Sequence, residues 1–78
     1  KMKINNLEQT CFGCPTVFEW DDKNNNHFYF RLRHGYARIE NETTDETVIG
    51  DSMGNFDGVC SWDDVISWAK ENGLKIEE

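Results

Sequence analysis

Hydrophobic and polar positions alternate most clearly between residues 28 and 41. Phe28, Phe30 and Leu32 take every second position, with polar or charged residues between them. Ala37 and Ile39 continue the alternation further along the chain. A period of two is typical of strands with one buried face. The pattern therefore predicts two strands, 28–33 and 36–40, that share an apolar face, followed by an acidic loop over 41–46.

Two residues interrupt this alternation and predict a tight hairpin loop. Gly35 accepts the positive φ that such a loop requires, and His34 tolerates it better than most residues do. The loop sets which residues face one another. The expected pairs are Leu32–Ala37 and Phe30–Ile39 on the apolar face, and Arg33–Tyr36, Arg31–Arg38 and Tyr29–Glu40 on the polar face.

Three other segments show weaker strand patterns. Residues 16–21 alternate around Phe18 and Trp20, and residues 22–26 are all polar, as expected of a loop. Placing Trp20 opposite Phe28 joins the apolar faces of 16–21 and 28–33. Residues 47–49 predict a short last strand. Residues 1–10 predict either a short strand or a loose arm.

A helix is expected after Ser61. The Ser61 hydroxyl and the Asp64 carboxylate have the spacing of a capping box, and Gly73 has the position of a C′ glycine. Apolar residues between them form one stripe, made by Trp62, Val65, Ile66 and Ala69. The sequence thus predicts a single α+β domain over 1–78, with a three- to four-stranded antiparallel sheet and one C-terminal amphipathic helix packed on one face.

Charge is distributed unevenly along the chain, whose net charge is −7. Residues 27–39 hold three Arg and no acid, whereas residues 40–78 hold eleven acids and two Lys. Phosphates would be repelled by the chain as a whole, so we expect no direct nucleic-acid binding. The acidic part suits the basic surface of a partner protein, or serves solubility alone. The carboxylates expected to bind such a partner are Glu40, Glu42, Asp45, Glu46, Asp51 and Asp57.

No apolar run is long enough to span a bilayer, and no segment has the features of a secretion signal. The expectation is a cytoplasmic monomer without membrane contact. An enzyme needs a nucleophile with a base, paired acids or an open metal site, and only Cys60 with a histidine approaches this. A non-enzymatic protein is therefore expected.

The cysteines predict a structural zinc site. Cys11 and Cys14 form a Cys-x-x-Cys turn, and Cys60 precedes the helix. The expected strand register places Cys14 opposite His34, which becomes the fourth ligand, with Asp57 as a carboxylate substitute. His27 then lies at the other end of its strand, roughly 23 Å away. The alternative is that the thiols are ordinary buried or turn residues without a metal.

The polar face of the hairpin offers a second kind of site. Guanidinium groups bind phosphates in bidentate fashion, and phenol rings stack on bases. The residues concerned are Tyr29, Arg31, Arg33, Tyr36 and Arg38. This pattern predicts a binder of phosphate or nucleotide ligands, unless Glu19 and Glu40 neutralise the arginines.

Two runs of residues resemble short proteins carried by bacterial viruses, and type II anti-CRISPR inhibitors in particular. The first run is Cys14-Pro15-Thr16-x-Phe18-Glu19, and the second is Phe28-Tyr29-Phe30-Arg31-x-Arg33-His34-Gly35. The resemblance implies a phage-encoded inhibitor that binds a host CRISPR effector nuclease in the host cytoplasm, by protein contact or by imitating nucleic acid. It assigns no role to any single residue.

Overall fold

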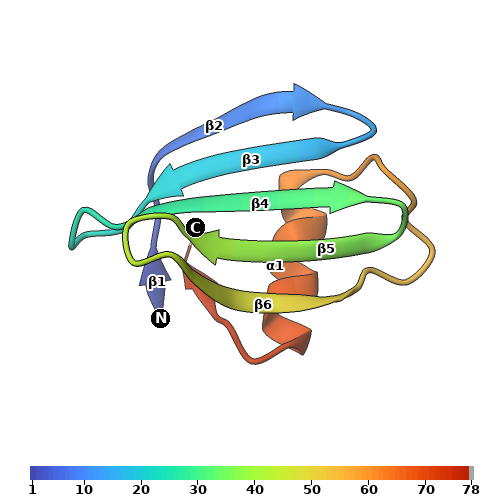
Figure 1. The fold of residues 1–78 in the computed structure, drawn as a ribbon. Helices are drawn as coiled ribbons and strands as arrows, with labels where there is room; N and C mark the ends of the chain where they lie inside the picture. The colour runs from blue at the N-terminus through green and yellow to red at the C-terminus, as the bar shows by residue number, and fades with distance from the viewer. Residues whose placement is uncertain (78) are drawn as a thin grey trace.

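The computed structural model describes residues 1–77, and most of them belong to one antiparallel sheet. Its five strands follow one another in space as they do in the chain (Figure 1). They are β2 (Asn5–Phe12), β3 (Thr16–Asp21), β4 (His27–Arg33), β5 (Tyr36–Asn41) and β6 (Glu46–Ser52). Helix α1 (Trp62–Glu71) covers one face of the sheet. A short parallel pair, β1 (Met2–Lys3) with β7 (Ile76–Glu77), joins the two ends of the chain.

The prediction of three to four strands was wrong, because the sheet has five and a separate parallel pair accompanies it. The additional strand is β2, in a region where the sequence left open a short strand or a loose arm over residues 1–10. It is an edge strand whose pairing with β3 is interrupted by two register shifts. Most of its side chains are exposed, so its sequence shows no apolar alternation. Strands β1 and β7 have two residues each, too few for any pattern. The class remains α+β.

The central register agrees with the prediction from the sequence. Trp20 pairs with Phe28, and all five predicted pairs across the 34–35 loop are present. His34 and Gly35 both have positive φ, 53° and 77°. The alternation excludes a shift by one residue, which would turn the apolar side chains to the solvent, and the two-residue loop fixes the pairing among the registers that remain.

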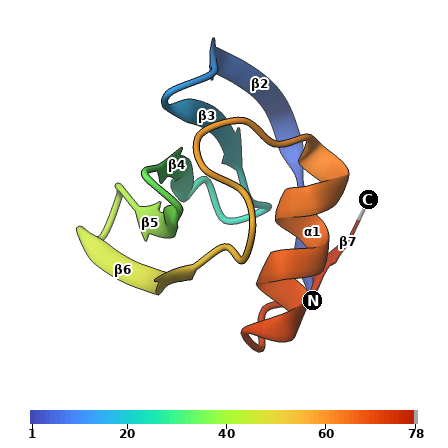
Figure 2. The same ribbon diagram turned by 90° about the vertical axis from the view of Figure 1, so that its right-hand side faces the viewer.

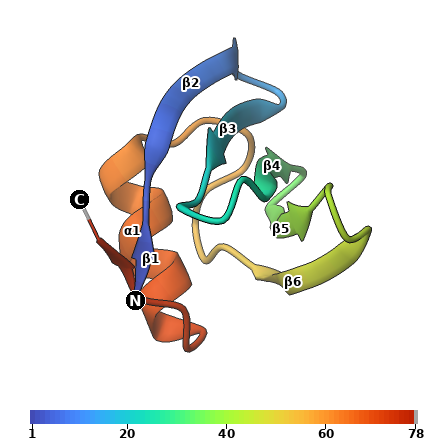
Figure 3. The ribbon, with the colours of Figure 1, turned by 90° about the vertical axis from the view of Figure 1, so that its left-hand side faces the viewer.

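The hydrophobic core lies between the sheet and α1. Figures 2 and 3 show the sheet as a curved layer with α1 on its concave side. Phe30 is fully buried, and its ring lies 5.7 Å from that of Trp68 in an edge contact. Trp20 stacks on Phe28 at 5.8 Å and meets Trp62 edge-on at 5.1 Å. Aromatic rings bury much area, so they let a small chain build a dense core.

Both predicted ends of the helix are present. The Ser61 hydroxyl accepts from the Asp64 amide at 3.2 Å, and the Asp64 carboxylate accepts from the Ser61 amide at 2.8 Å. Beyond the helix, Gly73 has a φ of 89° and the Leu74 amide donates to Ala69 at 2.8 Å. Helix α1 has ten residues, and within 1–77 no helix has the length and apolarity needed to cross a bilayer.

The connection from β6 to α1 is attached to the tips of the hairpins by backbone hydrogen bonds. The Gly35 amide donates to the Asp57 carbonyl at 2.7 Å, and the Met53 amide donates to the Gly35 carbonyl at 2.9 Å. The Cys14 amide donates to the Gly58 carbonyl at 3.0 Å. This connection therefore has a defined path although it contains no regular structure.

Candidate functional site

The sheet face that points away from α1 carries two groups of opposite charge. The first, here called the acid–histidine cluster, consists of Glu19, Asp21, His27 and Glu42. The second, here called the arginine group, consists of Arg31, Arg33 and Arg38. Side chains two or four positions apart on a strand share a face, so His27, Arg31 and Arg33 of β4 all lie on this outer face.

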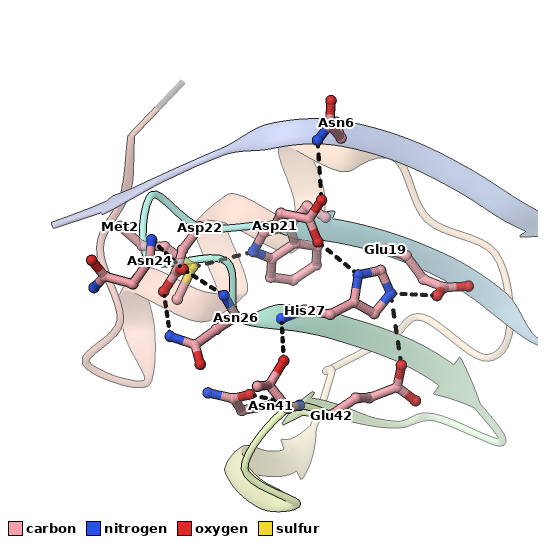
Figure 4. Close-up of polar contacts among 12 residues, drawn as sticks. Met2, Asn6, Glu19, Asp21, Asp22, Asn24, Asn26, His27, Asn41 and Glu42 are labelled. Carbon is pink, nitrogen blue, oxygen red and sulfur yellow. Dashed lines mark hydrogen bonds and ion pairs between the residues drawn. The ribbon is translucent and has the colours of Figure 1, made fainter.

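His27 is the centre of the acid–histidine cluster. It begins β4 directly opposite Asp21, the last residue of β3. Its Nδ1 lies 2.8 Å from Asp21 Oδ1, and its Nε2 lies 2.8 Å from Glu19 Oε1 (Figure 4). Glu42 Oε1, from the β5–β6 turn, lies 3.7 Å from the same Nε2. Three separate segments therefore meet at one imidazole ring.

Neighbouring groups hold the carboxylates in place. Asn6 donates from its side-chain amide to Asp21 Oδ2 at 3.0 Å, and the Thr10 hydroxyl donates to Glu19 Oε2 at 3.0 Å, both from β2. The Glu42 amide donates to the His27 carbonyl at 2.8 Å, which fixes the backbone of the turn beside the ring. The cluster is thus held by β2 on one side and by the β5–β6 turn on the other.

These contacts favour the protonated ring. The hydrogen bond with Glu19, followed by the one with Asp21, raises the pKa of His27 above its usual value, against the effect of burial. The His27 hydrogen bond also lowers the pKa of Asp21, with help from Asn6. A neutral imidazole donates from one nitrogen only, whereas an imidazolium donates from both. In the metal-free cluster the two carboxylate partners therefore favour the imidazolium form of His27 over the neutral ring.

The arginine group lies further along the same face. Arg31 and Arg38 are direct cross-strand partners, and Arg33 faces Tyr36. The Nε of Arg38 is buried without a hydrogen bond, and Glu40 Oε1 lies 3.4 Å from it. Within residues 1–77 no carboxylate lies within 4.0 Å of Arg31 or Arg33.

The acids expected to neutralise the arginines have other partners. Glu19 is taken up by His27 and Thr10. Glu40 contacts Arg38 and accepts a hydrogen bond from the Thr47 hydroxyl at 2.6 Å. Two positive charges on this face are therefore left without acidic partners in the described part of the chain.

Two tyrosines accompany the arginine group. Tyr29 pairs with Glu40 and is partly buried. It stands between His27 and Arg31 on the same face of β4, and so between the acid–histidine cluster and the arginine group. Tyr36 is half exposed, and its phenol end occupies the space above Gly50 in which a side chain would otherwise stand. The five residues predicted for ligand binding thus share one open surface.

The four predicted zinc ligands do not meet as expected. Among residues 1–77, Glu19, His27 and Glu42 are the one group of three potential ligands whose donor atoms lie within 4.8 Å of one another. Cys11 pairs with Val17 on the outer face, whereas Cys60 is part of the core on the helix side. Zinc binding by the cysteines stays a prediction.

The separate positions of these residues explain this result. Cys14 is exposed in the turn before β3, where its sulfur lies beside Gly58, and His34 is exposed at the hairpin tip. Burial, and then the Asp64 charge, raise the pKa of Cys60 to about 11. Its thiol is therefore protonated at neutral pH, which disfavours a thiolate ligand in the metal-free chain.

The six carboxylates predicted for partner binding occupy two ends of the sheet. Glu42, Asp45 and Glu46 belong to the β5–β6 turn or its border, beside His27, and Glu40 precedes them in β5. Asp51 pairs near the far end of β5, and Asp57 lies in the connection beneath Gly35. Partner binding by these carboxylates stays a prediction.

His27 is the functional candidate that sequence reasoning missed. The predicted register already placed it opposite Asp21, and Glu19 alternates onto the same face. The predicted zinc site, however, used His34 at the other end of the strand. Only the position of Glu42 could not be predicted in this way, because Glu42 lies in the β5–β6 turn, beyond the alternating segment.

Comparison with known proteins yields no relative for this chain. No family model, no curated protein and no solved structure matches it.

Proposed function

We propose that the protein is a non-enzymatic binding protein whose arginine group takes up the phosphate groups of a nucleotide. The observation that carries the proposal is the pair Arg31 and Arg33, which have no carboxylate within 4.0 Å among the described residues of a chain with net charge −7. Acidic side chains are abundant here, so unpaired arginines side by side on one face indicate a place for an external anion.

The arrangement of the arginines has an energetic cost without such an anion. Arg31 and Arg38 stand directly opposite each other, and like charges in this position destabilise a sheet by a few tenths of a kcal/mol or more. A phosphate between guanidinium groups removes this repulsion and accepts charge-assisted hydrogen bonds. Ligand binding and local stability are therefore coupled at this face.

The tyrosines support a nucleotide rather than a simple phosphate. Tyr36 is 51% exposed and borders Arg33, and an exposed phenol ring can stack on a base. Stacking is worth about 1–3 kcal/mol per base. A ligand with both a base and phosphates therefore gains more from this surface than inorganic phosphate does.

Calorimetric titration tests the proposal. ATP, GTP and pyrophosphate are titrated into the wild type and into an Arg31→Gln/Arg33→Gln variant. Each hydrogen bond to a charged group contributes about 1.5–3 kcal/mol, so losing both guanidiniums weakens nucleotide binding by roughly 100-fold or more. Pyrophosphate, which has no base, is expected to bind less tightly than either nucleotide.

A matched variant controls for total charge. Lys70→Gln/Lys75→Gln removes two positive charges from exposed positions remote from the outer face, and its affinity is expected to equal that of the wild type. No binding of any of the three probes, or an equal loss in both variants, would contradict the proposal. Circular dichroism spectra of all three proteins verify that the fold is retained.

Inhibition of a CRISPR effector nuclease, which the phage-protein resemblance implies, stays a prediction. Its test is charge reversal at Asp45, Glu46, Asp51 and Asp57, which is expected to abolish inhibition while the fold survives. Because these acids occupy two ends of the sheet, reversing each end separately also shows which end contacts the nuclease.

A further inference from the structure

We propose that Glu19, His27 and Glu42 bind a divalent transition-metal ion on the outer face of the sheet, with Asp21 as the residue that orients His27. The three donor atoms come from β3, β4 and the β5–β6 turn, and they lie within 4.8 Å of one another. This site is independent of the arginine group and of the cysteines.

The separations of the donors lie close to those of ligands around one ion, one slightly shorter and one slightly longer. Metal–nitrogen and metal–oxygen bonds of about 2.1 Å place neighbouring ligands about 3.0–3.4 Å apart. His27 Nε2 lies 2.8 Å from Glu19 Oε1 and 3.7 Å from Glu42 Oε1, which brackets this range. Small side-chain rotations are therefore enough to place all three donors around an ion.

The second nitrogen of the ring is oriented as in metal-bound histidines. Asp21 Oδ1 lies 2.8 Å from Nδ1, so a proton on Nδ1 leaves the Nε2 lone pair directed at Glu19 and Glu42 (Figure 4). A carboxylate behind the imidazole is the usual partner of a histidine ligand. Thr10 holds the other oxygen of Glu19 in the same manner.

The charges of the cluster favour a cation that carries more than one positive charge. Three carboxylates surround one imidazole, which can supply at most one positive charge. Glu42 makes no side-chain hydrogen bond within residues 1–77, and its only close contact is at 3.7 Å. A divalent ion that replaces the proton on Nε2 offsets more of the carboxylates' negative charge than the proton does, and it gives Glu42 a partner.

The ligand types indicate the class of metal. One imidazole and two carboxylates suit zinc, manganese, iron or cobalt better than the soft copper(I) ion. The side chains of His27 and Glu42 are 42% and 49% exposed, so an ion here keeps open positions for water or for a ligand atom from a partner. Zinc is the probe of choice because it has no redox chemistry.

Competition with a chromophoric chelator at pH 7.5 tests the site. The wild type is expected to bind one equivalent of Zn²⁺, and His27→Gln is expected to abolish this binding. Glu42→Gln keeps the hydrogen-bonded ring contacts and is expected to weaken binding at least about tenfold. Asp21→Asn retains all three ligands and is expected to weaken binding about 10–100-fold.

Two controls separate this site from its alternatives. Glu46→Gln removes one negative charge from the same turn and is expected to leave zinc affinity unchanged, as is Cys11→Ser/Cys14→Ser. The proposal is overturned if the wild type binds no zinc. It is also overturned if the cysteine variant loses the ion while Glu42→Gln, with a wild-type circular dichroism spectrum, retains it.

Discussion

The hydroxyl of Thr16 donates a buried 2.7 Å hydrogen bond to the carbonyl of Gly58, 42 residues further along the chain. The same carbonyl also accepts a hydrogen bond from the Cys14 amide. The start of β3 and the connection before α1 are therefore held together at one oxygen atom. Thr16 is fully buried, so water cannot replace the hydroxyl.

Replacing this hydroxyl by a methyl group tests its contribution. Thr16→Val keeps the shape of the side chain and leaves one of the two bonds to Gly58 unmade. Urea unfolding is expected to show a loss of about 1–2 kcal/mol in the free energy of unfolding. Thr47→Val, the same change at an exposed position of β6, is expected to stay within about 0.5 kcal/mol of the wild type. Equal effects at both sites would refute the special role of Thr16.

Gly58 itself leaves no room for a side chain. A Cβ there would lie 2.8 Å from the Cys14 sulfur and 3.2 Å from its Cα. The backbone of the turn must move to accept it, so Gly58→Ala is expected to cost about 1–3 kcal/mol in urea unfolding.

Gly50→Ala is the matched substitution. The added methyl meets the phenol of Tyr36, a half-exposed side chain that can turn away into solvent. Its effect on unfolding is therefore expected to be about 0.5 kcal/mol or less. A larger loss for Gly50→Ala than for Gly58→Ala would contradict this account of the two glycines.

The capping box at the start of α1 predicts a third stability effect. Ser61→Ala removes the acceptor of the Asp64 amide and is expected to cost about 1 kcal/mol. Ser67→Ala, an exposed position inside the same helix, is expected to be neutral or slightly stabilising because alanine has the higher helix propensity. Thermal unfolding of the two variants compares them directly. If Ser61→Ala is as stable as Ser67→Ala, the cap contributes nothing measurable.

The cysteines are expected to differ in reactivity. Cys14 is exposed, whereas burial raises the pKa of Cys60 to about 11, so about 0.1% of Cys60 is thiolate at pH 8. Iodoacetamide should therefore modify Cys14 first and Cys60 only when the chain unfolds. Peptide mass spectrometry over time follows each site, with a urea-unfolded sample as the reference. Equal rates at Cys14 and Cys60 in the folded protein would contradict the described burial.

Sequence reasoning succeeded where neighbouring residues determine the outcome. The apolar alternation of β4 and β5 together with the two-residue loop between them defines one register, and the Ser61–Asp64 spacing is a local signal. The sequence did not decide between a short strand and a loose arm at β2, because an edge strand with exposed side chains is held by backbone pairing, which leaves no mark on the hydrophobic pattern. Strands β1 and β7 form only because residues 2–3 and 76–77 lie side by side in the fold, and no local sequence pattern indicates this contact.

The candidate sites show the same division. The arginine group and the two tyrosines beside it follow from the alternation of β4 and β5, so these five residues were predicted together. The zinc prediction relied on Cys11 and Cys60 approaching each other. The pairing of β2 with β3, which that prediction did not include, places Cys11 on the outer face of the sheet. Cys60 lies in the core on the opposite face. Sequence spacing alone does not distinguish the two faces of an unrecognised strand.

The pairing of β1 with β7 also determines how the fold meets mechanical load. The two strands are parallel, and the Met2 amide donates to the Lys75 carbonyl at 2.8 Å. Tension applied at residue 1 and residue 77 enters β1 at its start and β7 at its end, so the strands are pulled past each other. Their hydrogen bonds then share the force and break together instead of opening one by one. Of the two sheets within residues 1–77, the smaller one is thus the part through which tension between residues 1 and 77 must first pass.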